Sequence, residues 1–328
     1  MSNTPVTFKD FNAQERDLLL QAAQKILAET SPSGNDIWPS IGRAVTLLPD
    51  SLAEKLGNIS SPSGVTVLRG VFSVDDVAIG PTPEHWSAAR GDELWDVLLM
   101  LASAAMGEPM ACEDQQAGRF VHNIVPSRGQ ETTQTGASST GLLNPHTEDA
   151  FHPDRAHLLV LACMRNHDAV PTTAASVRHV SLSEEDIAVL KNPHLPILPD
   201  TAYAPVPFDG EPIPVPVLWS TDEGMMMRFD PSYTPLSDGS PEFSEAYARL
   251  ADELNKETLH VNLDPGDLLV VENDMVAHGR VPFRAKYDGT DRWLKRTLIR
   301  MKNGAQRRPA AEAEEHGYGH TLLVADLS

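Results

Sequence analysis

The stretch NPHTEDAFHPDRAHLLVLACMRN, residues 144–166, combines a candidate metal motif with a candidate strand. Its second half, AHLLVLACMR (156–165), is an apolar run of the length expected for a fully buried β-strand. In its first half, His146 lies two residues before Glu148. Because residues i and i+2 of an extended segment point to one face, these two side chains should project together while Thr147 points away. The stretch therefore predicts a buried strand preceded by a paired imidazole and carboxylate.

The rest of the chain supplies helices first and short strands later. Apolar residues at helical spacing predict helices over 11–30, 92–106 and 240–257. Runs rich in β-branched or apolar residues predict strands over 63–72, 119–126 and 292–301, and a strand, Pro-Gly turn and strand over 259–273. Strands dominate from 119 to 301. This order predicts a mainly β fold, a sandwich or jelly roll with flanking helices packed outside it.

No repeat or linker divides the sequence, so we expect a single domain over 1–328. Residues 1–60 are expected to form a helical N-terminal extension. The proline-rich segment 192–217 is predicted to be a lid or binding loop, because long loops are otherwise uncommon inside compact domains. The charged segment 303–328 is expected to be a peripheral tail.

Composition excludes several classes of partner. The net charge of −20 would repel phosphate backbones, so nucleic acid is not an expected partner. No apolar run approaches the roughly 18 residues of a membrane helix, and the N-terminus lacks the features of a signal peptide. Cys112 and Cys163 alone make neither a disulfide framework nor a thiolate zinc site. We therefore expect a cytoplasmic protein that acts on a small molecule, without a membrane partner.

A third candidate ligand lies far along the chain. His278 falls within DPGDLLVVENDMVAHGR (264–280), where a tight turn, a buried strand and a polar loop would bring an imidazole to a barrel mouth. Two histidines and one carboxylate on one face of an ion are the ligands of non-haem iron(II) oxygenases. An H-x-E pair also arises often by chance, and His152 is a rival ligand. The other histidines considered are interpreted as solvated or hydrogen-bonded: His157, His167, His179 and His260.

Two arginines follow in RWLKRTLIR (292–300). In a strand, Arg292 and Arg296 share one face with Leu294 and Leu298. An inward guanidinium is costly unless it is paired, and it matches a carboxylate through two parallel hydrogen bonds. Arg292 is thus predicted to clamp the distal carboxylate of 2-oxoglutarate, and Arg296 to take a second carboxylate. The alternative is a solvated, arginine-rich edge strand.

These motifs together resemble the clavaminate synthase-like iron(II)/2-oxoglutarate oxygenases, nearest the hydroxylases of free arginine, lysine, asparagine and citrulline. The resemblance covers about residues 60–301. It implies a distorted double-stranded β-helix (jelly roll, cupin-like) core, with Fe(II), 2-oxoglutarate and O2 as cofactor and cosubstrates. The implied reaction is hydroxylation at C3 or C4 of a free polar or basic L-amino acid, releasing succinate and CO2, in specialised metabolism such as antibiotic biosynthesis.

The resemblance also implies roles for individual residues around the metal. His146, Glu148 and His278 take the places of the iron ligands. Arg292 takes the place of the 2-oxoglutarate anchor, and either Thr172 or Thr173 is similar to the threonine that assists it.

The implied substrate site involves another set of residues. Arg296 matches the arginine that holds the substrate α-carboxylate beside Glu148. Gln115, with Gln116 as the alternative, is similar to the glutamine at the α-amino group. Asp200 falls in the segment that resembles the substrate lid, and Asp230 matches an aspartate that recognises the substrate side chain.

One position departs from the arginine hydroxylases. At the place of the aspartate that recognises the substrate side chain, the resemblance implies two aspartates two residues apart in the arginine hydroxylases. This chain has Asp230 and then Ser232. A single carboxylate suits an ammonium, ureido or amide group as well as a guanidinium, and Asp200 and Asp230 also fit turns beside prolines. Two alternative functions remain: a cupin-like metal-dependent isomerase or hydrolase, and a non-catalytic barrel that binds a metal or small molecule.

Overall fold

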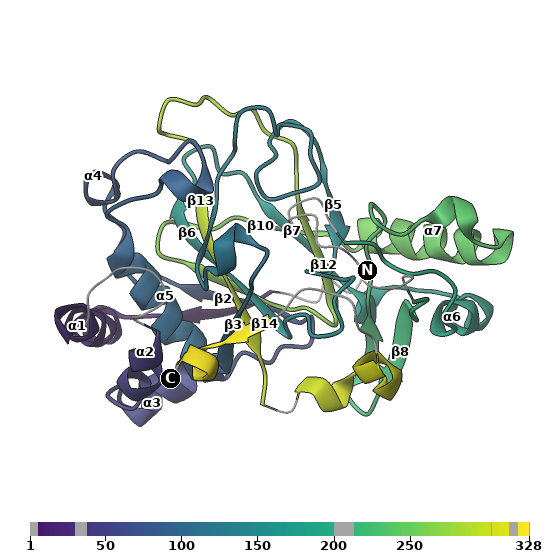
Figure 1. Ribbon diagram of the computed structural model, residues 1–328, viewed down its shortest axis with the longest axis horizontal. Helices are drawn as coiled ribbons and strands as arrows, with labels where there is room; N and C mark the ends of the chain where they lie inside the picture. The colour runs from purple at the N-terminus through teal and green to yellow at the C-terminus, as the bar shows by residue number, and fades with distance from the viewer. Residues whose placement is uncertain (1–5, 30–37, 200–212, 303, 315–320, 328) are drawn as a thin grey trace.

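The computed structural model describes residues 6–29, 38–199, 213–302, 304–314 and 321–327. Two β-sheets form its core (Figure 1). The larger sheet runs in the order β1 (Thr7–Asp10), β2 (Val65–Arg69), β11 (Leu268–Glu272), β6 (Leu158–Arg165), β13 (Trp293–Arg300), β3 (Glu108–Cys112), β14 (Thr321–Leu323), with β4 (His122–Ile124) beside β13. The smaller sheet runs β10 (Leu259–Val261), β7 (Thr172–Ser176), β12 (Val276–Arg280), β5 (Leu143–His146). The predicted distorted jelly roll is confirmed.

The inner faces of the two sheets share one hydrophobic core. Leu159, Leu294 and Leu298 of the larger sheet pack in one cluster with Ala174 and Val276 of the smaller sheet. On the opposite face of β13, Trp293 and Ile299 pack in a different cluster. The alternation predicted for residues 292–300 is therefore confirmed. The edge-strand alternative is wrong, because β13 pairs with β6 on one side and with β3 and β4 on the other.

Helices cover the outer faces of both sheets (Figure 1). Over the larger sheet lie α1 (Ala13–Glu29), α2 (Pro39–Val45), α3 (Asp50–Gly57) and α5 (Glu93–Met106). Over the smaller sheet lie α6 (Glu184–Lys191), α7 (Pro241–Lys256) and the hairpin of β8 (Leu218–Thr221) and β9 (Gly224–Met227); the short α4 spans Asp76–Ile79. The three predicted helices are present, within about two residues at each end.

None of the helices in the described ranges is long and apolar enough to cross a membrane.

A buried lysine ties α5 to the strand that carries the predicted carboxylate-binding arginines. Lys295 is fully buried and pairs with Asp92 and Asp96 at the start of α5. Replacing Lys295 by alanine is expected to lower the free energy of unfolding by about 3–5 kcal/mol, because two carboxylates would remain buried without their cation. Urea denaturation measures this loss, with Lys256→Ala on the exposed side of α7 as the control. A loss equal to that of the control would contradict the assignment.

The C-terminal segment is less peripheral than expected. Glu312 is 4% exposed and pairs with Arg155 at 2.7 Å, and Arg308 pairs with Asp274 at 3.0 Å. The expectation of a peripheral tail is therefore wrong for these residues. Their charges are satisfied inside the fold, which a reading of local composition does not reveal.

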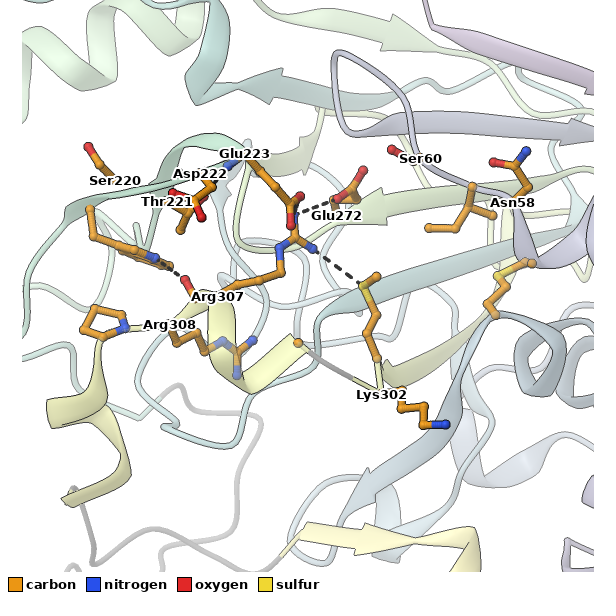
Figure 2. A pocket seen from close by; sticks show the side chains of 17 residues that line it. Asn58, Ser60, Ser220, Thr221, Asp222, Glu223, Glu272, Lys302, Arg307 and Arg308 are labelled. Carbon is orange, nitrogen blue, oxygen red and sulfur yellow. Dashed lines mark hydrogen bonds and ion pairs between the residues drawn. The ribbon is translucent and has the colours of Figure 1, made fainter.

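Arg307 anchors the same segment beside a cavity of about 930 Å³ (Figure 2). Its guanidinium lies 2.9 Å from Glu223 and 3.2 Å from Glu272, and its carbonyl accepts a hydrogen bond from Trp219 at 2.7 Å. Among the described residues, none of those predicted for the functional site lines this cavity. The predicted metal ligands lie elsewhere in the fold.

Candidate metal centre and active site

Two side chains that are close in sequence, His146 and Glu148, meet the distant His278 beside the smaller sheet. His146 ends β5, and His278 on β12 is its register partner. Glu148 lies two residues after His146, and its Oε2 is 3.2 Å from Nε2 of His278. The three residues each offer one ligand atom, and these atoms lie within 4.8 Å of one another. The structure thus brings together the ligand set that the sequence singled out.

The hydrogen bonds and charges in this cluster suit a divalent metal. His146 Nδ1 lies 2.8 Å from the Asn144 carbonyl, so it donates there and leaves the Nε2 lone pair available. Burial alone would raise the pKa of Glu148, but Arg296 and His278 hold that pKa well below its usual range. Burial and the neighbouring His146 lower the pKa of His278. Two imidazoles and one carboxylate are a donor set that fits iron(II).

The close approach of β12 to β5 brings His278 next to His146. A Cβ atom at Gly279, next to His278, would lie 2.4 Å from the Leu143 carbonyl oxygen. A larger residue would therefore push β12 away from β5, whereas glycine leaves room for the neighbouring backbone. The VAHGR motif thus has a structural reason for its glycine directly after the ligand.

Arg292 directly precedes β13 and has no counter-ion among the described residues. Its guanidinium donates to Thr172 Oγ1 at 2.9 Å, and no carboxylate of the described residues contacts it. The side chain is buried, its Nε has no partner, and burial lowers the pKa to about 10. A buried cation is costly unless it is paired, so this position fits the carboxylate of a bound acid.

The choice between the two threonines follows from the register of β7. Thr172 lines the cavity and contacts Arg292, whereas Thr173 is not among the lining residues. The structure therefore favours Thr172 as the residue that assists the anchor.

A cavity of about 690 Å³ joins these features. Its lining includes the metal cluster, the anchor and the second arginine: His146, Glu148, His278, Thr172, Arg292, Arg296 and Gln115. The cavity is large enough for a dicarboxylate and an amino acid together. The residues that sequence analysis assigned to the metal, the cosubstrate and the substrate α-carbon therefore face one space.

Arg296 links Glu148 of the metal cluster to Gln115, another residue of the cavity lining. Its guanidinium pairs with Glu148 Oε1 and donates to Gln115 Oε1 at 2.7 Å. Gln116 instead uses its amide on the backbone of Asn123, at 3.0 and 3.1 Å, and so has a structural role. The structure favours Gln115 over Gln116 at the substrate site.

Two residues at the site were not predicted. His122 is the register partner of Arg296 and lies 2.6 Å from it through Nδ1; burial and the Arg296 charge hold its pKa well below the usual range. Arg280 lines the cavity and donates to the carbonyls of Ser138, Ser139 and Gly141, which holds that loop against the site. Neither residue had a signal in the sequence, because each depends on a long-range pairing.

Asp230 and Asp200 were the two aspartates predicted for the outer part of the substrate site. Asp230 is 8% exposed, and its Oδ1 accepts from the backbone of Ser232 and Tyr233 at 2.9 and 3.2 Å, so the turn role is real. Burial raises the pKa of Asp230, although the hydrogen bonds from the backbone of Ser232 and Tyr233 act in the opposite direction. Asp200 lies outside the described residues. The flanks of its segment, Leu195 and Val215, form a β-bridge.

The rival histidines do not join the metal cluster. His152 Nδ1 accepts from the backbone N–H of Asp154 at 3.0 Å, and the metal cluster found among the described residues does not include His152. His157 Nδ1 likewise accepts from the backbone N–H of Met301 at 3.3 Å, and His157 is not part of that cluster either. His146, Glu148 and His278 remain the ligand set.

A jelly roll with two histidines and one carboxylate beside a buried unpaired arginine defines the class of mononuclear iron(II)/2-oxoglutarate oxygenases. The family model described as taurine catabolism dioxygenase TauD, TfdA family, matches residues 210–298. Enduracididine beta-hydroxylase of Streptomyces hygroscopicus is 35% identical over 263 residues, 72% of this chain and 76% of that protein. L-asparagine oxygenase of Streptomyces coelicolor is 31% identical over 313 residues, 90% of this chain and 91% of that protein.

Solved structures agree with these relatives. The non-heme iron oxygenase OrfP in complex with iron, succinate and (3S)-hydroxy-L-arginine has a TM-score of 0.80 at 35% identity, covering 90% of this chain and 94% of that chain. The chain belongs to the clavaminate synthase-like group of the TauD/TfdA family of iron(II)/2-oxoglutarate-dependent oxygenases.

Proposed function

We propose that this oxygenase hydroxylates an unactivated side-chain carbon, C3 or C4, of a free polar or basic L-amino acid. The observation that carries the proposal is the pair of guanidiniums, Arg292 and Arg296, that line one cavity together with the assigned metal ligands. Arg292 suits the distal carboxylate of 2-oxoglutarate. Arg296 then suits the α-carboxylate of an amino acid, with Gln115 beside it for the α-amino group.

The names of the similar proteins support this substrate class. The relatives from Streptomyces are named for enduracididine and L-asparagine, and the OrfP structure contains a hydroxylated arginine. The enduracididine relative also supports a role in antibiotic or other specialised metabolism.

The mechanism assigns one task to each group of residues. His146, Glu148 and His278 would hold the iron, and Arg292 with Thr172 would hold 2-oxoglutarate. Iron, 2-oxoglutarate and O2 together supply the oxidising power for hydroxylation, with release of succinate and CO2. Arg296 and Gln115 fix the backbone of the substrate, so that its C3 or C4 faces the metal and water is kept from the reacting carbon.

Glu148 couples the two halves of the site. Its Oε2 faces His278, whereas its Oε1 accepts from Arg296. One carboxylate oxygen is therefore placed for the metal while the other orients the guanidinium that meets the substrate. A substrate that engages Arg296 lies directly beside the metal ligand.

Asp230 offers a test of side-chain recognition. Asp230→Asn retains the Oδ1 acceptor for Ser232 and Tyr233 and removes only the charge. We expect KM for a basic amino acid to rise roughly tenfold, with KM for 2-oxoglutarate unchanged, because the lost interaction concerns substrate binding alone. Steady-state kinetics over basic and neutral amino acids measure this. An unaltered substrate profile would leave Asp230 with its turn role only.

The decisive test of the proposed function is a screen for succinate release across the free amino acids, under iron, ascorbate and air. We expect one or a few polar or basic amino acids to stimulate succinate release and to gain one oxygen atom by mass spectrometry. Turnover without consumption of O2 and 2-oxoglutarate would instead support an isomerase or hydrolase. Turnover of a carrier-bound or peptide substrate alone would show that the free-substrate proposal is wrong.

A further inference from the structure

The backbone around Glu148 has no ordinary strand partner. Strand β5 ends at His146, so the ladder with β12 does not extend to Glu148. The side chain of Asn273 takes the place of a strand here. Its Oδ1 accepts from the Glu148 N–H at 2.6 Å, and its Nδ2 donates to the Glu148 carbonyl at 2.9 Å. One amide therefore holds both backbone polar groups of the assigned metal ligand.

Asn273 is itself rigidly placed. It is fully buried, and its Nδ2 also donates to the Ala156 carbonyl at 3.0 Å. Its backbone N–H donates to the His157 carbonyl at 2.9 Å. Asn273 directly follows β11 and precedes β12, the strand that carries His278. The amide thus connects the segment of one assigned ligand, Glu148, to the turn that precedes the strand of another, His278.

The conformation next to Glu148 needs such support. On the other side, Thr147 donates its N–H to the Phe229 carbonyl at 2.8 Å and accepts from the Phe229 N–H at 3.1 Å. Immediately after Glu148, Asp149 has a φ of 50°, a left-handed conformation that persists only where the surroundings hold it. Thr147 is held by Phe229, and the Glu148 backbone is held by Asn273. In this conformation the Glu148 side chain faces His278 and Arg296.

We infer that Asn273 is a positioning residue that sets the Glu148 carboxylate at the metal. The inference rests on the proposed role of Glu148 as a ligand. Asn273 does not contact the metal cluster directly; it acts through the Glu148 backbone. Partners that orient a metal ligand are worth roughly 10–100-fold in metal affinity. Asn273 is expected to contribute on that scale.

The informative variant is Asn273→Asp. An aspartate keeps the acceptor for the Glu148 N–H but faces two carbonyl oxygens, those of Glu148 and Ala156, without a donor. We expect the affinity for Fe(II), measured by anaerobic titration, to fall roughly 10–100-fold. The visible spectrum of the Co(II)-substituted protein should change as well, because the carboxylate would no longer have its native position.

A matched control lies outside the site. Asn166 holds a loop in the same way, since its Oδ1 accepts from Val170 N–H at 3.0 Å and its Nδ2 donates to the Val170 carbonyl at 3.2 Å. Asn166→Asp should lower the melting temperature without altering Fe(II) affinity or the Co(II) spectrum. Equal losses of metal affinity in both variants would overturn the inference, because they would reflect general destabilisation.

Further outcomes separate the inference from the proposed function. Native Fe(II) affinity and a native Co(II) spectrum in folded Asn273→Asp would overturn the positioning role. Should that variant not fold, Asn273→Ser retains a hydroxyl for one of the two Glu148 backbone groups and is expected to bind Fe(II) roughly tenfold more weakly; native affinity there would overturn the role equally. Native Fe(II) affinity in Glu148→Ala would instead show that Glu148 is not a metal ligand, and this would contradict the proposed metal centre itself.

Discussion

The variant His146→Ala is expected to lose iron-dependent succinate formation entirely while remaining folded. His146 supplies one of only three protein ligand atoms, and its ring is partly exposed at the end of β5, so its removal leaves little buried space. A site with two protein ligands holds a divalent ion weakly, and the cosubstrate then lacks a metal to chelate. Anaerobic Fe(II) titration, circular dichroism and succinate release measure the three parts of this result.

The matched control is His152→Asn in the same segment. His152 was the rival ligand, and an asparagine preserves an acceptor for the Asp154 N–H. This variant should bind Fe(II) normally. Substantial turnover in His146→Ala, or loss of iron binding in His152→Asn, would show that the ligand assignment is wrong.

The second large effect is expected at the 2-oxoglutarate anchor. Arg292→Ala should raise KM for 2-oxoglutarate by roughly a hundredfold or more, because truncating one partner of a buried charge pair costs about 2–5 kcal/mol. Iron affinity should stay close to native, since Arg292 is not part of the metal cluster. The preference for 2-oxoglutarate over a 2-oxo acid with an apolar end should also collapse.

Arg300 provides the control for that experiment. It ends β13, the strand that Arg292 directly precedes; its side chain is 29% exposed and lies 3.6 Å from Asp154. Arg300→Ala should leave KM for 2-oxoglutarate unchanged. An unchanged KM in Arg292→Ala would remove that residue as the anchor and would favour a metal enzyme that does not use 2-oxoglutarate.

The parts of the fold that were predicted correctly are those that follow from local periodicity in the sequence. The apolar run 156–165 and the alternation in 292–300 correspond to β6 and β13, at the middle of the larger sheet. The i, i+2 spacing placed His146 and Glu148 on one side. These predictions succeeded because strand geometry alone determines which side chains share a face.

Other features depended on register between distant strands. The choice of Thr172 over Thr173 follows from how β7 pairs with β12, and His122 joins the site only because β4 lies beside β13. Gln115 and Gln116 are adjacent, and a positive φ of 46° at Gln116 separates their directions. Sequence spacing contains none of this information.

The C-terminal segment shows a different limit. Its charged, alanine-rich composition suggested a surface tail, but Arg308 and Glu312 pair inside the fold with Asp274 and Arg155. Buried charges are found almost only where they are paired, and the partners here lie more than 30 residues away in sequence. Composition alone therefore predicts exposure for residues that the fold has buried.

A crystal structure of the protein grown anaerobically with Fe(II) and 2-oxoglutarate tests the central claim most directly. We expect one metal ion bound by His146, Glu148 and His278, chelated by 2-oxoglutarate, with the distal carboxylate of that acid on the guanidinium of Arg292. An ion bound by other residues, or 2-oxoglutarate bound away from Arg292, would contradict the account.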